Sequence, residues 1–135
     1  MESGKLFTIH SLEPISEIPA GAFLSIGNFD GVHRGHVHVV ERLQSLAAAR
    51  GVASVVLTFD PHPLALLRPQ IAPIPLLPPQ RKADLLQAAG ASRVGIFQTG
   101  PWLLELTARE FFDQVIVKLF AATGLVEGWD FRFGR

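Results

Sequence analysis

The feature that most restricts how this chain can fold is the alternation of short apolar runs with segments of helical periodicity. Short runs rich in hydrophobic and β-branched residues are typical of buried strands. Such runs occur at residues 5–10, 22–26, 52–59 and 92–97, and residues 124–135 are expected to form a last strand that leads into a turn. Between them lie three predicted helices, at residues 36–50, 81–90 and 107–122. This order predicts an α/β domain with a mainly parallel sheet and helices on both faces.

Further local signals refine this pattern. Thr107 is followed three residues later by Glu110, which is the spacing of a capping box and marks the start of the last helix. The core-facing side of that helix is expected to consist of residues that recur at helical spacing, namely Phe111, Val115 and Leu119. Residues 60–80 contain seven prolines and are predicted to be irregular.

The composition excludes several classes of function. Its 135 residues are enough for one domain with a hydrophobic core. Lys and Arg together number 12, as do Asp and Glu, and no basic block occurs, so nucleic acid is not an expected partner. Thiolate chemistry is excluded because the chain has no cysteine. No signal-peptide pattern and no apolar stretch of ~20 residues is present, so we expect a soluble, cytoplasmic protein without a membrane partner.

Polar clusters follow three of the predicted strands, at the points where those strands end. They occupy residues 27–36, 60–63 and 130–135. The carboxyl ends of parallel strands meet at one edge of a sheet, and ligands of such sheets bind there. The sequence therefore predicts that the three clusters converge on one ligand site.

The first cluster has the features of a phosphate site. Gly27 and Gly31 allow backbone conformations closed to other residues and a close approach of a ligand. His33 and His36 are three residues apart at a helix start, so they face the same side and can donate N–H bonds to phosphate oxygens. Gly35 leaves room beside them, and the first turn of a helix attracts anions. These features favour a phosphorylated ligand.

Other interpretations of these residues exist. His33 and His36 could bind zinc together with His38 and Asp30. However, His38 lies two residues beyond His36, on another side of the predicted helix, and is expected at the surface. A local role in a turn, with bonds to backbone N–H groups, is as plausible for Asp30 as direct contact with a ligand.

The second cluster is equally open to a local interpretation. Asp-Pro pairs commonly begin turns, so Asp60 and the neighbouring His62 are candidates either for a turn or for ligand contact. The spacing of residues 60–63 does not distinguish these roles by itself.

Taken together, the motifs resemble those of a known family. GNFDGVHRGH at 27–36 resembles the G-x-F-D-x-x-H-x-G-H motif of the nucleotidyltransferase superfamily. Further matching segments are TFDPHP at 58–63, RKADLLQAAG at 81–90, LTAREFF at 106–112 and GWDFRFGR at 128–135. In this combination and order, the chain resembles the FMN adenylyltransferase domain of bacterial bifunctional riboflavin kinase/FAD synthetase.

This resemblance implies a Rossmann-like nucleotidyltransferase fold and a reaction in which ATP and FMN give FAD and pyrophosphate with Mg²⁺. It also implies roles for individual residues. His33 and His36 match the catalytic histidines that contact the ATP phosphates. The implied ATP-binding residues are Gly27, Asn28, Phe29, Asp30 and Gly35. The implied flavin-binding residues are Asp60, His62, Asp130 and Phe131, and no residue is assigned as a metal ligand.

The family's pattern extends beyond Arg135. In the family, the last motif is followed by a Ser/Thr-rich segment ending in an arginine that also holds the ATP phosphates, and then by a riboflavin kinase domain. We therefore expect residues 1–135 to be an FMN adenylyltransferase domain that is incomplete at its C-terminus, with the kinase domain present in a full-length version. Little FAD synthesis is expected from the isolated chain. The alternative is a non-catalytic fragment that binds nucleotide or flavin weakly.

Overall fold

In the computed structural model, which describes residues 5–32, 34–71 and 77–127, one five-stranded parallel sheet forms the centre of the fold. The strand order is β1-β4-β3-β2-β5, and every pair is parallel. The strands are β1 (Leu6–Ile9), β2 (Phe23–Ile26), β3 (Ser54–Asp60), β4 (Arg93–Gln98) and β5 (Gly124–Leu125). The predicted α/β class and the first four predicted strand positions are confirmed, whereas the last predicted strand begins at Gly124 as a two-residue strand and its remainder, from residue 128 on, lies outside the described residues.

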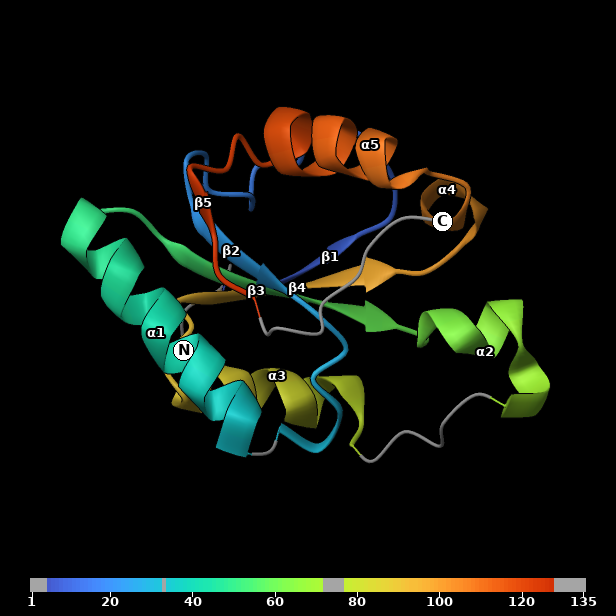
Figure 1. The fold of residues 1–135 in the computed structure, drawn as a ribbon, viewed down its shortest axis with the longest axis horizontal. Helices are drawn as coiled ribbons and strands as arrows, with labels where there is room; N and C mark the ends of the chain where they lie inside the picture. The colour runs from blue at the N-terminus through green and yellow to red at the C-terminus, as the bar shows by residue number, and fades with distance from the viewer. Residues whose placement is uncertain (1–4, 33, 72–76, 128–135) are drawn as a thin grey trace.

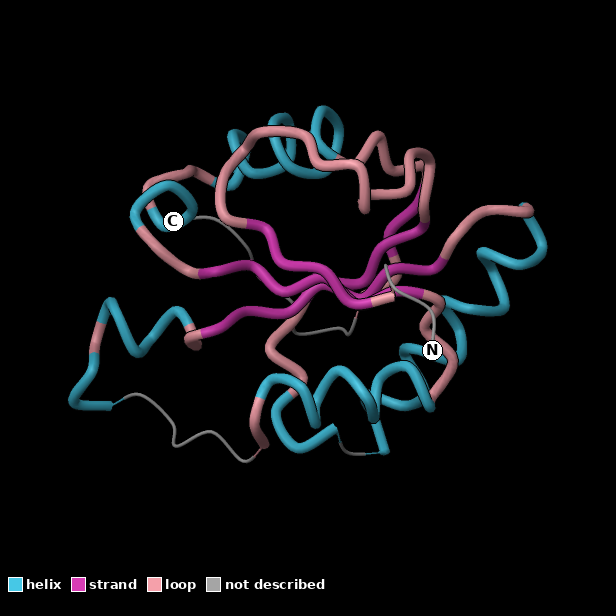
Figure 2. The backbone as a smooth tube through the Cα atoms, turned by 180° about the vertical axis from the view of Figure 1, so that it is seen from behind, coloured by secondary structure: helices cyan, strands magenta, loops and turns pink. Residues whose placement is uncertain are grey.

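Helices cover both faces of the sheet (Figures 1 and 2). One face packs against α1 (Arg34–Arg50) and α3 (Pro79–Ala88). The other packs against α4 (Pro101–Leu104) and α5 (Ala108–Phe111), which continues as the wider π-helix η3 (Phe112–Leu119). The remaining elements are the short helices η1 (Asp30–Val32), α2 (Pro63–Leu67) and η2 (Pro69–Ile71).

The last predicted helix packs as its spacing indicated. Thr107 and Glu110 form a complete capping box at the start of α5. The three residues assigned to its core-facing side are 3%, 0% and 9% exposed, in the order Phe111, Val115 and Leu119. The predicted helical face is therefore the face that covers the sheet.

The prediction that residues 60–80 are irregular is wrong for part of that range. Pro63 occupies the first position of α2, where its fixed φ and missing N–H are tolerated. The ring of His62 caps the same helix, because its Nδ1 accepts the Leu64 N–H at 3.0 Å. Proline would break a helix in its interior, but at the first position, as here, it is compatible with a helix.

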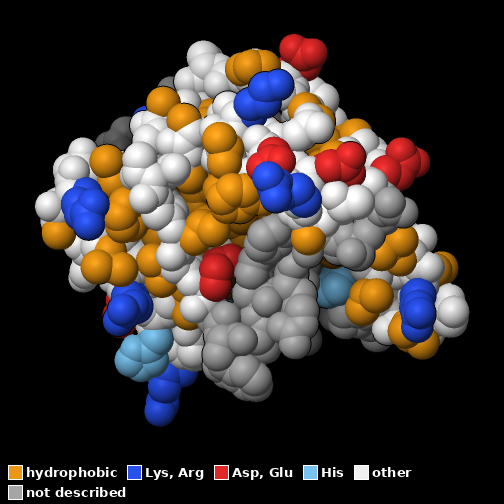
Figure 3. Space-filling view, turned by 45° about the horizontal axis from the view of Figure 1, so that its top comes forward, with side chains coloured by type: hydrophobic (Ala, Val, Ile, Leu, Met, Phe, Trp, Pro, Cys, Tyr) orange, Lys and Arg blue, Asp and Glu red, His pale blue; other side chains and the backbone are white. Residues whose placement is uncertain are grey.

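Some hydrophobic side chains remain exposed. Orange side chains gather over α2 at one end of the molecule and over the α5–η3 layer (Figure 3). The α2–η2 segment exposes Leu66, Leu67 and Ile71, and η3 exposes Phe112 and Val117. Within the described part of the chain, no helix is long and apolar enough to cross a membrane.

The strand order determines where a ligand can bind. From β2 the chain proceeds to β3 and then β4 on one side, whereas β5 adds to the opposite side of β2. In open parallel sheets, the crevice beyond the carboxyl ends of the strands at such a reversal is the usual ligand site. The loop after β2 and the segment after β3 both lie at this edge.

Candidate functional site

The loop between β2 and α1 has an unusual backbone. Phe29, Gly31 and Val32 have φ values of 51°, 75° and 45°. Positive φ is uncommon outside glycine and is a clear outlier for a β-branched residue. Such conformations persist only where the surrounding structure fixes them, and they concentrate at functional sites. The loop therefore holds a defined, strained shape.

Two glycines of this loop serve different purposes. Gly31 adopts the left-handed conformation that the sequence predicted for it. Gly27 does not. A β-carbon at Gly27 would lie 3.2 Å from the ring of Phe29, so its missing side chain gives room for that buried ring instead.

Phe29 also positions one of the two motif histidines. Its ring meets the ring of His36 edge-on, with a centroid distance of 5.2 Å. His36 lies in the first turn of α1, which begins at Arg34, two residues earlier than predicted. Gly35 occupies the same turn, so both residues lie at the positive end of the helix dipole, which favours anions.

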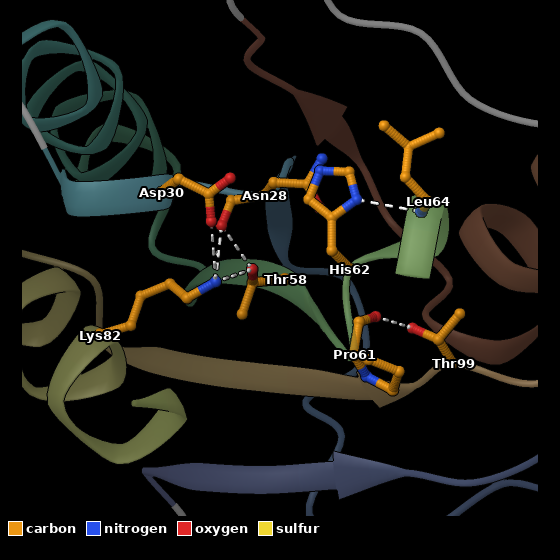
Figure 4. A network of polar contacts seen from close by, with 8 residues as sticks. All are labelled: Asn28, Asp30, Thr58, Pro61, His62, Leu64, Lys82 and Thr99. Carbon is orange, nitrogen blue, oxygen red and sulfur yellow. Dashed lines mark hydrogen bonds and ion pairs between the residues drawn. The ribbon is translucent and has the colours of Figure 1, made fainter. Parts of the chain in front are cut away.

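A lysine of α3 binds the β2–α1 loop through hydrogen bonds. Lys82 Nζ donates to the backbone oxygen of Asn28 at 2.7 Å and to Thr58 Oγ1 at 3.3 Å. Thr58 in turn donates to the same Asn28 oxygen at 3.0 Å, which closes a small network (Figure 4). Lys82 Nζ also lies 3.9 Å from Asp30 Oδ1. The loop, β3 and α3 are thereby joined at one point.

The side chain of Lys82 is largely removed from solvent. Lys82 is 8% exposed. Burial lowers the pKa of Lys82, while the charges of Asp30 and Asp60 oppose that change. A charge in such a position requires both hydrogen bonds and a counter-charge.

The network forms one wall of a cavity of about 310 Å³. Residues of the loop and residues that follow β3 line it together, which brings the GNFD and TFDPHP motifs to a single place. The described residues that line it are Asn28, Asp30, Phe59, Asp60, Pro61, His62, Ala65, Leu77, Pro78, Pro79 and Lys82. The buried side-chain oxygen Oδ1 of Asn28 has no hydrogen-bond partner among the described residues.

The segment after β3 forms the turn that its sequence allowed, and it also lines the cavity. Thr99 donates its hydroxyl to the Pro61 carbonyl oxygen at 2.6 Å and its N–H to the Asp60 carbonyl oxygen at 3.1 Å, which fixes the turn. The Asp60–Pro61 peptide bond is cis. Because His62 Nδ1 accepts a backbone N–H, the neutral ring holds its proton on Nε2 and can act as a donor. Both Asp60 and His62 nonetheless line the cavity.

Thus the structure brings together Asn28, Asp30, Asp60 and His62, with Phe29 and His36 beside them. His33, Asp130 and Phe131 lie outside the described residues. His38 is exposed, as predicted. No group of three or more His, Asp or Glu side chains that could hold a metal occurs within residues 5–32, 34–71 and 77–127.

Two residues of this region were missed by sequence reasoning. One is Lys82. The other is Glu127, which follows β5 and accepts hydrogen bonds from the last two residues of β2. Its Oε1 accepts the Ile26 N–H at 2.8 Å and the Ser25 hydroxyl at 2.9 Å. Among the described residues β5 pairs with β2 through Gly124 and Leu125, and this carboxylate accepts the N–H of Ile26 just beyond that pairing.

We expect Glu127→Gln to stabilise the protein at alkaline pH. Burial raises the pKa of Glu127 to about 7 from 4.5, although its hydrogen bonds to Ile26 and Ser25 oppose the rise. Between these two values the folded state binds more protons than the unfolded chain, so this group makes stability fall as pH rises through that window. Glutamine keeps an acceptor for the Ile26 N–H and does not ionise.

Urea unfolding of both proteins should show the variant to be more stable above pH 7, with the gain shrinking toward pH 4.5. Glu41→Gln, at an exposed carboxylate of α1, is the matched control and should show little pH-dependent gain. An equal gain for Glu127→Gln at all pH values would contradict the explanation.

Comparison with known proteins agrees with this geometry. A family model described as FAD synthetase matches residues 15–135. Relatives include the bifunctional riboflavin kinase/FMN adenylyltransferases of Pseudomonas fluorescens (37% identical over 126 residues, 93% of this chain and 39% of the relative) and Escherichia coli K12 (35% over 127 residues, 93% and 41%). The enzyme of the same description from Bacillus subtilis is 31% identical over 132 residues, which is 95% of this chain and 42% of the relative. The chain thus spans about two fifths of these relatives.

The fold also has a counterpart among solved structures. The crystal structure of a protein described as a macrolide-efflux protein from Streptococcus pneumoniae matches with a TM-score of 0.80 and 26% sequence identity. The match covers 96% of this chain and 43% of that one. The parallel sheet, the two motif loops around one cavity and the family model over residues 15–135 lead to one conclusion. The chain belongs to the FAD synthetase family.

Proposed function

We propose that this chain is an FMN adenylyltransferase domain that makes FAD and pyrophosphate from ATP and FMN. In this reaction a phosphate oxygen of FMN attacks the α-phosphorus of ATP and forms a new P–O bond. The bond from that phosphorus to the bridging oxygen breaks, and pyrophosphate leaves with the electron pair. The main support is that residues of the GNFD and TFDPHP motifs, about thirty positions apart, line one cavity beside the start of α1.

The residues divide into two groups by position. ATP is proposed to bind at the β2–α1 loop and at the start of α1. The residues of this group are Gly27, Asn28, Phe29, Asp30, His33, Gly35 and His36. Positioning the phosphates and offsetting their charge are the main needs of such transfers. The segment after β3, with Asp60 and His62, is proposed to face the flavin, together with Asp130 and Phe131. A riboflavin kinase domain is the proposed partner in a full-length cytoplasmic enzyme.

Magnesium fits the donors that this cavity offers. Asp30 and Asp60 both line it, and Mg²⁺ in proteins is commonly held by one or two carboxylates together with substrate phosphates. These two residues would hold the ion, which would offset negative charge on the phosphates.

Removal of divalent cations should therefore strongly lower the rate of FAD formation. Treatment with EDTA is expected to lower the rate by about 10²-fold or more, because charge relief by a metal contributes several kcal/mol to phosphoryl transfer. Added Mg²⁺ should restore the rate, as followed by chromatography of FAD. Full activity in EDTA would remove the metal from the proposal.

Direct measurement of the reaction tests the function itself. The full-length protein is incubated with ATP, FMN and Mg²⁺, and FAD and pyrophosphate are quantified separately. Equal amounts of the two products are expected. Binding of both substrates without any product would instead support the non-catalytic alternative, and binding of neither would contradict the proposal.

A further inference from the structure

Lys82 differs in its setting from the other basic residues of the chain. Among the described residues that line the cavity, Lys82 is the only lysine or arginine. Its side chain runs from α3 toward Asn28 and Asp30, as Figure 4 shows, and its ammonium group ends at the cavity wall. No role for this residue follows from the sequence analysis, although Lys82 lies within RKADLLQAAG, one of the segments that match the family.

The hydrogen bonds of Lys82 leave part of its capacity for a ligand. An ammonium group has three N–H donors. Two are accounted for by the Asn28 oxygen at 2.7 Å and Thr58 Oγ1 at 3.3 Å. Asp30 Oδ1, at 3.9 Å, is too distant for a third hydrogen bond. An oxygen atom placed in the cavity can therefore receive the third N–H.

The charge balance favours an anion in that place. Lys82 is 8% exposed, and the Asp30 carboxylate lies at an ion-pair distance of 3.9 Å without a hydrogen bond to it. A buried ammonium group is best stabilised when all of its N–H donors are paired, and here one N–H remains for a ligand. A doubly charged phosphate against the ammonium group would accept that N–H in a short, charge-assisted hydrogen bond.

We propose that Lys82 Nζ donates a hydrogen bond to the phosphate of FMN, and that this contact makes the site select FMN over riboflavin. This role rests on the proposed function. Because that phosphate is also the attacking group, the contact would orient its oxygens and reduce its repulsion from the phosphates of ATP. Lys82 gives up no proton in this step; it binds and positions the nucleophile.

Two ligands that differ only by the phosphate test this role. FMN and riboflavin are titrated separately into the protein and into Lys82→Met, with flavin fluorescence as the readout. The original protein should bind FMN about 10- to 100-fold more tightly than riboflavin, as expected for a hydrogen bond between charged groups. In Lys82→Met the affinity for FMN should fall to near that for riboflavin, while the affinity for riboflavin should stay unchanged.

Two further variants make the comparison specific. Lys118→Met removes an exposed lysine of η3 on the other side of the sheet and should leave the preference for FMN intact. Lys82→Arg keeps the charge and should retain a preference for FMN, and it serves as the test if Lys82→Met does not fold. Circular dichroism and thermal unfolding establish that each variant is folded.

The outcomes separate this role from other roles of Lys82. Equal losses of FMN and riboflavin affinity would show that Lys82 only supports the loop, which would overturn the proposal. Loss of affinity for a non-hydrolysable ATP analogue, with FMN affinity unchanged, would also overturn it and would assign the lysine to the nucleotide. If the original protein bound neither flavin, the flavin-binding function itself would fail, which is a different result from an unselective flavin site.

Discussion

His36→Ala is expected to lower the rate of FAD formation by about 10²–10³-fold while leaving the fold intact. His36 lies in the first turn of α1, half-buried, with its ring held edge-on against Phe29. A side chain fixed in this way at the positive end of a helix can stabilise negative charge that develops on phosphate oxygens. Loss of one preorganised donor of this kind typically costs about 2.7–4 kcal/mol of transition-state stabilisation.

The measurement is kcat and KM for FAD formation by the full-length protein, with thermal unfolding as a check of the fold. His38→Ala is the matched control, because His38 is two residues along the same helix and exposed. Its kcat should equal that of the original protein. A rate for His36→Ala close to that of His38→Ala would remove His36 from the catalytic machinery.

The sheet could be predicted because burial on both faces leaves a clear signal in the sequence. Val55, Val56 and Leu57 are all fully buried, since α5 and η3 cover one side of β3 and α1 covers the other. A strand of this kind has to be apolar throughout. The glycine- and histidine-rich cluster that follows β2 could be found for a similar reason, because its residue types are unusual together.

The polar contacts of the site leave a much weaker signal. Ile26 and Glu127 are separated by 101 positions, and nothing in the local sequence indicates that a side chain will accept an N–H of β2. For Lys82 a signal did exist. It is four residues before the buried Leu86 and next to the buried Ala83, so helical spacing places it on the inward side of α3. A lysine on an apolar helical face requires a partner.

The sequence pattern does not predict the short helix α2, because the prolines of residues 60–80 indicate only breaks in helical structure. Pro63 begins the helix, and His62 caps it with a ring nitrogen, which is not among the usual N-cap groups. The result matters for the site, because this cap holds the ring of His62 at the cavity wall.

The aromatic side chains of one face connect the core of the sheet to this site. Phe97 of β4 is fully buried. Its ring stacks on Phe59 at a centroid distance of 5.3 Å and meets Trp102 and Phe111 at 6.3 and 6.1 Å. Phe59 precedes Asp60 and itself lines the cavity. The cluster thus joins β3, β4, α4 and α5 directly behind the proposed flavin side.

Phe97→Ala is therefore expected to lower the free energy of unfolding by about 3–5 kcal/mol, a large part of the ~5–15 kcal/mol typical of a domain. The loss combines the transfer of a buried ring with the cavity that it leaves. Phe112→Ala, at a ring that is 40% exposed on the adjoining helix, should cost no more than about 1 kcal/mol. Urea unfolding of both variants measures the difference. Equal losses would mean that the α4–α5 layer does not pack on β4 as described, and the wall behind Asp60 would then need a different explanation.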